Sequence, residues 1–162
     1  DIMNTLSDIV EMPWTDTDKK IIARLSLNPI SPRFLKYRVF DVFVSTDKTI
    51  TKMKAICVHE ILHFIYFEKW KDVFRDYDKS QFEPPHLVWK LSEMVPKDIL
   101  SDKRLQNIFP HEVKVYREWD TVIIEGKPLL DYLQLIYDGK KDFKDFLIKS
   151  WEFVKEHEKE IR

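Results

Sequence analysis

An almost unbroken apolar run from Met53 to Phe67 is the feature that most limits how this chain of 162 residues folds. The run contains His59-Glu60-Ile61-Leu62-His63, one copy of the pattern H-E-x-x-H. Uncharged and mostly apolar residues surround both histidines, as expected of a helix that is buried on nearly all sides. We therefore predict a buried helix that begins at a capping threonine, Thr49 or Thr51, and ends at about Trp70.

The spacing of the two histidines predicts a zinc site. Residues four apart lie on the same face of a helix, so His59 and His63 can bind one Zn²⁺ ion. Glu60 lies roughly 100° around the helix from His59, near enough to reach a water on the metal without becoming a ligand. We expect Glu60 to act as a general base in peptide hydrolysis, taking the proton of a zinc-bound water and passing it to the leaving amine.

The alternative is a core helix with two hydrogen-bonded histidines and no metal. Burying two imidazoles and a carboxylate together costs several kcal/mol unless each finds a partner. This cost favours the metal site.

A zinc site of this kind needs a third protein ligand. The longer pattern H-E-x-x-H-x-x-G-x-x-H is excluded, because Tyr66 and Lys69 occupy its Gly and His positions. Prolines at 84, 85 and 96 delimit a predicted helix from His86 to Val95. Glu93 lies in this helix among apolar residues and is the preferred third ligand.

Two alternatives remain open for this helix. His86 lies seven residues before Glu93 on the same face, about 10.5 Å away, and is the second choice for the third ligand. Glu93 could instead pair with Lys90 or Lys97 on its own helix.

These residues resemble the gluzincin group of zinc metallopeptidases, in which H-E-x-x-H on one helix and a Glu on the next enclose the metal. The resemblance covers about residues 37 to 98 and rests on residues 58–64 and 91–93. It implies zinc ligands at His59, His63 and Glu93, with Glu60 as base and proton shuttle.

The resemblance also implies a fold, a partner and a supporting residue. The implied fold is α+β, a mostly helical zincin-like domain with a small sheet beside the H-E-x-x-H helix. The implied partner is an extended peptide that binds at the edge of a strand, and the strand Tyr37–Val44 is the candidate for that edge. Many gluzincins place an Asp four residues after the ligand Glu to orient a zinc histidine. Lys97 occupies that position here, and Asp98 is the candidate substitute.

A peptidase also needs a donor for the oxyanion that forms as water attacks the carbonyl. His111, Tyr116 and Arg117 are the candidates, because they follow closely after Phe109-Pro110. None of the three has a spacing that decides between them.

Apolar periodicity and Gly or Pro stops predict the remaining elements. They are a helix from Asp16 to Leu27, a strand from Tyr37 to Val44, a ribbon that pairs Val113 and Val115 with residues 122–124, a helix from Leu129 to Tyr137, and a helix from about Lys141 to Glu160.

Composition narrows the class of protein. With 44% hydrophobic residues, residues 1–162 are expected to form a single domain, with a metal core at about 37–98 and helical support at about 99–162. A net charge of −1 argues against nucleic acid or an anionic membrane as partner, and two glycines leave no phosphate cradle. The lone Cys57 forms no internal disulfide. No signal peptide is evident, so a cytoplasmic location is expected, although a chain that opens on Asp1 leaves a removed leader open.

Two functions are therefore kept. The first is a zinc-dependent peptidase acting on a peptide or protein substrate, with Glu60 as general base. The second is a catalytically inactive zincin-like regulatory or binding module. The first is preferred, because a purely structural zinc site has no need for Glu60 between the histidines.

Overall fold

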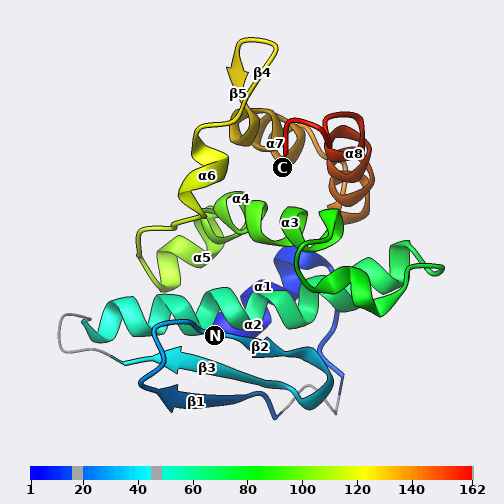
Figure 1. Ribbon diagram of the computed structural model, residues 1–162. Coiled ribbons are helices and arrows are strands. Elements are labelled where there is room, and N and C mark those ends of the chain that lie inside the picture. The colour runs from blue at the N-terminus through cyan, green and yellow to red at the C-terminus, as the bar shows by residue number, and fades with distance from the viewer. Residues whose placement is uncertain (16–19, 45–48, 162) are drawn as a thin grey trace.

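The computed structural model describes residues 1–15, 20–44 and 49–161, and it is mostly helical with two small sheets, an α+β architecture (Figure 1). The helices are α1 (Ile2–Val10), α2 (Ile50–Val73), α3 (Leu87–Met94), α4 (Pro96–Leu100), α5 (Lys103–Ile108), α6 (Arg117–Asp120), α7 (Leu129–Asp138) and α8 (Phe143–Glu156). The strands are β1 (Ile22–Ser26), β2 (Arg33–Phe34), β3 (Val39–Phe43), β4 (Ile123–Ile124) and β5 (Lys127–Pro128). Two 3₁₀ turns, η2 (Leu35–Tyr37) and η3 (Lys79–Phe82), complete the described elements.

The larger sheet has the order β1-β3-β2, with β1 parallel and β2 antiparallel to the central β3. The predicted strand Tyr37–Val44 is confirmed as the shorter β3, since Tyr37 belongs to η2; in β3 the buried Phe40 and Val42 alternate with partly exposed residues. The predicted helix from Asp16 to Leu27 is wrong, since Ile22–Ser26 forms β1; its residues 16–19 lie outside the described part of the chain. Ile22 and Leu25 have helical spacing, but they are 54% and 78% exposed, so they do not form a buried helical face. This segment forms a strand instead, because it pairs with β3.

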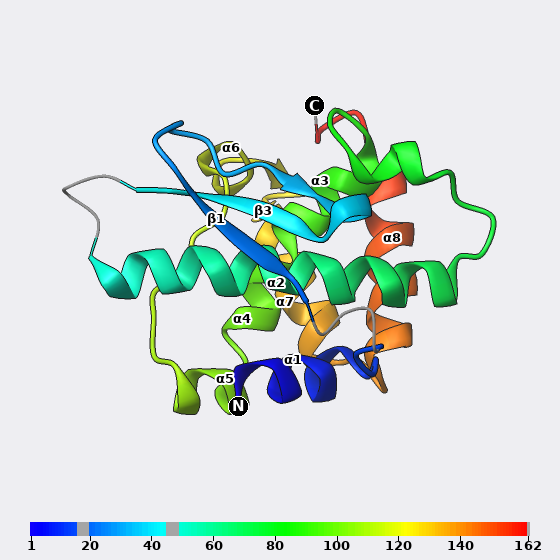
Figure 2. The same cartoon turned by 90° about the horizontal axis from the view of Figure 1, so that it is seen from below.

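The long helix α2 lies between the sheet and the other helices (Figures 1 and 2). It begins after Thr49, whose hydroxyl accepts a hydrogen bond from the backbone N–H of Lys52, which confirms one of the two predicted caps. One side packs on the sheet, where Phe64 meets Phe40 and Val42 of β3. The opposite side enters the larger helical core through Val58, Leu62, Ile65, Tyr66, Phe67 and Trp70. A helix buried from two sides has no need of a polar face, which explains the apolar run.

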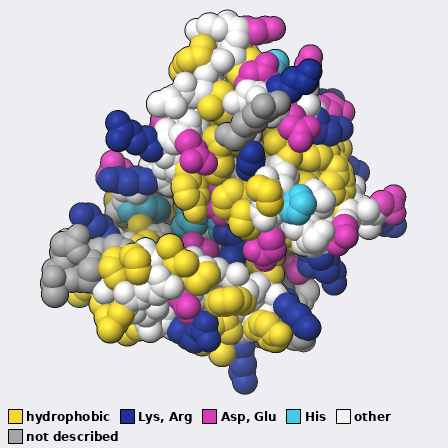
Figure 3. Space-filling view, viewed as in Figure 1, with side chains coloured by type: hydrophobic (Ala, Val, Ile, Leu, Met, Phe, Trp, Pro, Cys, Tyr) yellow, Lys and Arg dark blue, Asp and Glu magenta, His cyan; other side chains and the backbone are white. Residues whose placement is uncertain are grey.

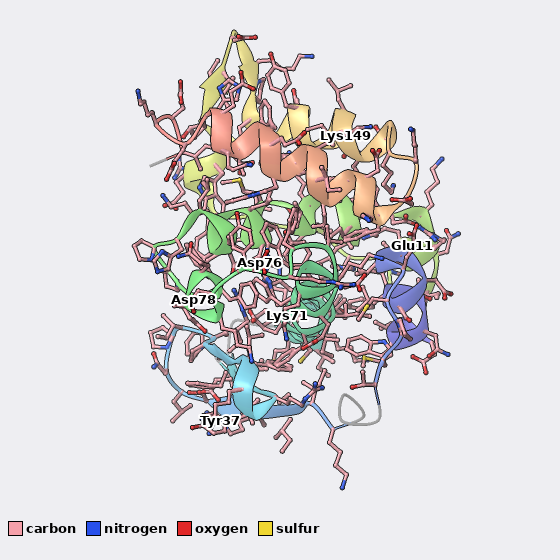
Figure 4. All side chains as sticks on the ribbon, turned by 90° about the vertical axis from the view of Figure 1, so that its right-hand side faces the viewer. Glu11, Tyr37, Lys71, Asp76, Asp78 and Lys149 are labelled. Carbon is pink, nitrogen blue, oxygen red and sulfur yellow. The ribbon has the colours of Figure 1, made fainter. Side chains whose placement is uncertain are left out.

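Figure 4 looks along the axis of α2 and shows the elements that surround it. Lys71 near the end of α2 lies close to the centre of this view, with Tyr37 and the sheet below it, Glu11 after α1 to one side, and Lys149 of α8 above it. Lys69 donates a hydrogen bond to the carbonyl of Glu11 at 3.0 Å and thereby fixes the end of α1, a helix that was not predicted.

The C-terminal helices agree with the sequence prediction, and the ribbon does not. Helices α7 and α8 are confirmed, and α8 is shorter than predicted, because Asp142 caps its start and it ends at Glu156. The predicted ribbon is wrong, since β4 pairs with β5 across Gly126 while residues 111–116 form no regular structure. Gly126 has φ +81°, which suits this tight turn. None of the helices in the described ranges is long and apolar enough to cross a membrane.

Candidate metal and catalytic site

The structure brings His59, His63 and Glu93 together at the middle of α2. Their candidate ligand atoms all lie within 4.8 Å of one another. Nε2 of His59 is 3.0 Å from Nε2 of His63 and 3.3 Å from Oε2 of Glu93, and Nε2 of His63 is 3.5 Å from Oε1 of Glu93. No second group of three potential ligands occurs within residues 1–15, 20–44 and 49–161.

Helix α3 brings Glu93 to α2 because of its apolar pattern. Val88, Leu91 and Met94 are buried in the helical core and fix the rotation of the helix. Glu93 lies beside this face and is only 3% exposed. Pro96 occupies the first turn of the next helix, α4, so that α3 ends just beyond the site.

Burial and neighbouring charges set the protonation of these groups. Burial, and then the positive charge of Arg33, lower the pKa of His63 to about 3, so its imidazole is neutral at pH 7. Burial alone would raise the pKa of Glu93, but His63, the hydrogen bond with His59 and the charge of Arg33 outweigh it and hold that pKa well below the usual range. A neutral imidazole and an ionised carboxylate are the forms that bind metal.

Glu60 has a different environment from Glu93. Its side chain is 9% exposed, and Oε2 has no hydrogen-bond partner within the described ranges. Burial raises the pKa of Glu60 to about 7, against the charges of His59 and Arg33, which lower it. Glu60 is therefore a carboxyl group that can exchange a proton near neutral pH.

Arg33 is a member of the site that the sequence did not indicate. Its Nη1 donates a hydrogen bond to Oε1 of Glu93 at 2.6 Å and lies 3.7 Å from Oε2 of Glu60. The side chain of Arg33 is 8% exposed, and Cζ of its guanidinium lies 5.7 Å from the ring centroid of Phe67. The sequence could indicate only that two buried carboxylates require a nearby cation, and not that Arg33 supplies it.

The site opens into a cleft at His59 and Glu60. Two cavities, of about 400 and 520 Å³, share these residues and extend from them in different directions. One wall is made by residues 30–33 beside the sheet and the other by residues 111–116. The space-filling view shows histidine side chains in the crevice between the sheet layer and the helices above it (Figure 3).

The candidate oxyanion donors differ in position. Tyr116 lines the cleft together with His59, Glu60 and Glu93. Burial and the negative charges of Glu93 and Glu60 raise the pKa of Tyr116, which keeps its hydroxyl protonated as a donor. Arg117 begins α6, is exposed and lines neither cavity of the cleft.

His111 lines the smaller cavity, but its ring is already engaged. Nδ1 lies 2.8 Å from the carbonyl oxygen of Phe109, an acceptor, so Nδ1 carries the proton. Nε2 is buried and has no hydrogen-bond partner among the described residues, and in this tautomer of a neutral ring it is an acceptor and not a donor.

Three further expectations are not met. His86 is the N-cap residue of α3 and does not belong to the ligand group. Asp98 is buried and neither of its oxygens has a hydrogen-bond partner in the described structure, so it orients neither histidine. The strand β3 cannot offer a free edge to a peptide, because β1 and β2 pair with both of its sides. The edge next to the cleft is the segment 30–33 instead.

Comparison of the chain with protein-family models, with curated proteins and with solved structures gives no significant match. The geometry of the cleft is therefore the basis for any inference about function.

Proposed function

We propose that this protein is a zinc-dependent peptidase. The observation that carries the proposal is the convergence of His59, His63 and Glu93 on one point, with Glu60 beside them in the same open cleft. Two imidazoles and one carboxylate form a common ligand set of catalytic zinc sites.

The separations of the ligand atoms support this ligand set. Two ligands on a tetrahedral zinc with bonds of about 2.1 Å lie about 3.4 Å apart. Nε2 of His59 lies 3.0 Å from Nε2 of His63 and 3.3 Å from Oε2 of Glu93, and both separations are close to that value. His63 is neutral and Glu93 is ionised at pH 7, and these are the forms that bind a metal.

When bound, zinc would supply a Lewis acid that polarises a carbonyl and lowers the pKa of a water. The chain's own groups supply the proton transfers. The Glu60 carboxylate accepts a proton from the attacking water and delivers it to the nitrogen of the leaving amine. The Tyr116 hydroxyl, on the opposite wall of the cleft, donates a hydrogen bond to the developing oxyanion.

Metal analysis of the purified chain tests the site. We expect about one zinc per chain after loading and dialysis, with loss of the metal in His59→Ala and in Glu93→Gln. His86→Ala is the matched control, because His86 lies at the start of α3 outside the ligand group, and it should retain the metal. A wild-type chain that binds no zinc would refute the proposal.

Cleavage of a degenerate peptide mixture, followed by mass spectrometry, tests the activity across many peptide sequences at once. Glu60→Gln should keep the zinc and lose hydrolysis by roughly 10²- to 10⁴-fold, the usual contribution of a general base. Glu68→Gln is the control. Glu68 lies on the same helix, but it forms an ion pair with Lys71 and is not part of the ligand group. Zinc binding without any cleavage would favour the inactive binding module instead.

A further inference from the structure

Arg33 contacts the two carboxylates of the site through a single nitrogen. Nη1 donates to Oε1 of Glu93 at 2.6 Å and lies 3.7 Å from Oε2 of Glu60. Nε and Nη2 of Arg33 have no partner within the described ranges. The guanidinium thus faces both carboxylates through the same nitrogen, and no other acceptor among the described residues holds its Nε or Nη2.

The contact divides the two oxygens of Glu93 between different partners. Oε1 accepts the hydrogen bond from Arg33 and lies 3.5 Å from Nε2 of His63, whereas Oε2 lies 3.3 Å from Nε2 of His59. A carboxylate without such a partner can bind a metal through both oxygens, which raises the coordination number.

We propose that Arg33 is a positioning residue that makes Glu93 a one-oxygen metal ligand. The inference rests on the metal site of the proposed function. Arg33 lies in β2 and Glu93 lies in α3, sixty residues later. The hydrogen bond between them therefore depends on the packing of the sheet against the site.

A purely structural role for Arg33 predicts a different outcome. An ion pair that only joins β2 to α3 stabilises the fold, and its loss lowers the melting temperature without changing how a bound metal is coordinated. The coordination number is therefore the readout that separates the two roles.

Cobalt(II) substitution measures this number, because the geometry of a transition metal is visible in its absorption spectrum. We expect the wild-type chain with cobalt to show the strong visible absorption of a four-coordinate ion, made by three protein atoms and one water. Arg33→Met should weaken that absorption by roughly two-fold or more, as the second oxygen of Glu93 joins the metal. Arg33→Lys should restore the wild-type spectrum, because an ammonium group also donates to Oε1.

Arg24→Met is the matched control. Arg24 pairs with Asp41 at 2.7 Å on the exposed face of the same sheet, so its loss removes an ion pair without touching the ligands. It should leave the cobalt spectrum unchanged. If Arg33→Met does not fold, Arg33→Gln carries the same expectation, since its shorter side chain no longer reaches Glu93.

The outcomes separate the inference from the proposed function. A spectrum of Arg33→Met or Arg33→Gln that equals the wild-type spectrum overturns the role of Arg33 and leaves the metal site standing. Failure of the wild-type chain to bind cobalt or zinc overturns the metal site itself.

Discussion

Asp98 is a buried carboxyl group without a hydrogen-bond partner among the described residues, and we predict that its ionisation lowers the stability of the protein as the pH rises from about 5 to about 8. It is 2% exposed, and both of its oxygens lack such a partner. Burial raises the pKa of Asp98 from 3.8 to about 7, and the charges of Lys97 and Lys140 only partly oppose this. The folded state therefore keeps a proton on Asp98 that the unfolded chain releases near pH 4.

The magnitude follows from proton linkage. A group whose pKa is raised on folding adds stability that is fully present below its unfolded pKa and is lost as the pH rises through its folded pKa. The loss is about 1.4 kcal/mol for each pH unit between these two values. From about pH 5 to about pH 8, the contribution of Asp98 to the free energy of unfolding should fall by about 3 kcal/mol.

Asp98→Asn isolates this contribution, because an amide does not titrate. The free energy of unfolding should be measured by urea denaturation with EDTA at several pH values from about 5 to 8. We expect the difference between Asp98→Asn and wild type to shift by about 3 kcal/mol in favour of the variant over this range. Any cost of burying the amide is the same at every pH and does not affect the slope.

Asp145→Asn is the control for this series. The hydrogen bond from Lys149 holds the pKa of the partly exposed Asp145 below its usual range, so that carboxylate is ionised in both states above about pH 5 and its variant should show no slope. If the Asp98→Asn difference is the same at pH 5 and pH 8 to within about 0.5 kcal/mol, Asp98 is not a buried titrating group and the reasoning is refuted.

Three further predictions concern packing, backbone and ligand linkage. Leu62→Ala removes a side chain that is 1% exposed and should cost about 2–5 kcal/mol in urea denaturation, whereas Leu135→Ala, at a side chain 55% exposed, should cost far less. Gly126→Ala places a side chain at φ +81° with no atom within 4 Å, so we expect a loss of about 1 kcal/mol from backbone strain alone, measured in the same way. Zinc at about 100 times its Kd should stabilise the wild type by about 2.7 kcal/mol in a thermal melt and should leave Glu93→Gln unchanged.

The parts of the fold that the sequence predicted correctly are those whose information is local. The threonine cap and the apolar run from Met53 to Phe67 lie within α2 itself, and Asp142 lies directly at the start of α8. Strand β1, in contrast, was predicted wrongly, because its structure depends on a distant segment. Its residues become a strand through pairing with β3, about 17 residues later, and most of them remain exposed. Apolar periodicity reports burial, so it misleads where apolar residues are not buried.

The residues of the candidate site also fall into those that local sequence predicts and one that it does not. His59, Glu60 and His63 follow from spacing on one helix, and Glu93 was predicted because a lone carboxylate in a proline-bounded apolar helix needs a partner. Arg33 could not be predicted, because the pairing of β2 with β3 is what carries it to Glu93. No spacing within a single element encodes that contact.

Glu93 and Asp98 show why a buried carboxylate alone does not identify a site. They lie five residues apart on consecutive helices, and burial by itself raises the pKa of both. Glu93 is met by His59, His63 and Arg33 from two other elements, which reverse the shift and keep it ionised. No described residue donates a hydrogen bond to Asp98, and the lysines near it only partly offset its burial. The helix breaks between α3 and α4 at Val95 and Pro96, so Glu93 and Asp98 lie on different helices and meet different groups. A buried acid thus becomes a candidate ligand only when other parts of the chain supply groups that stabilise its charge.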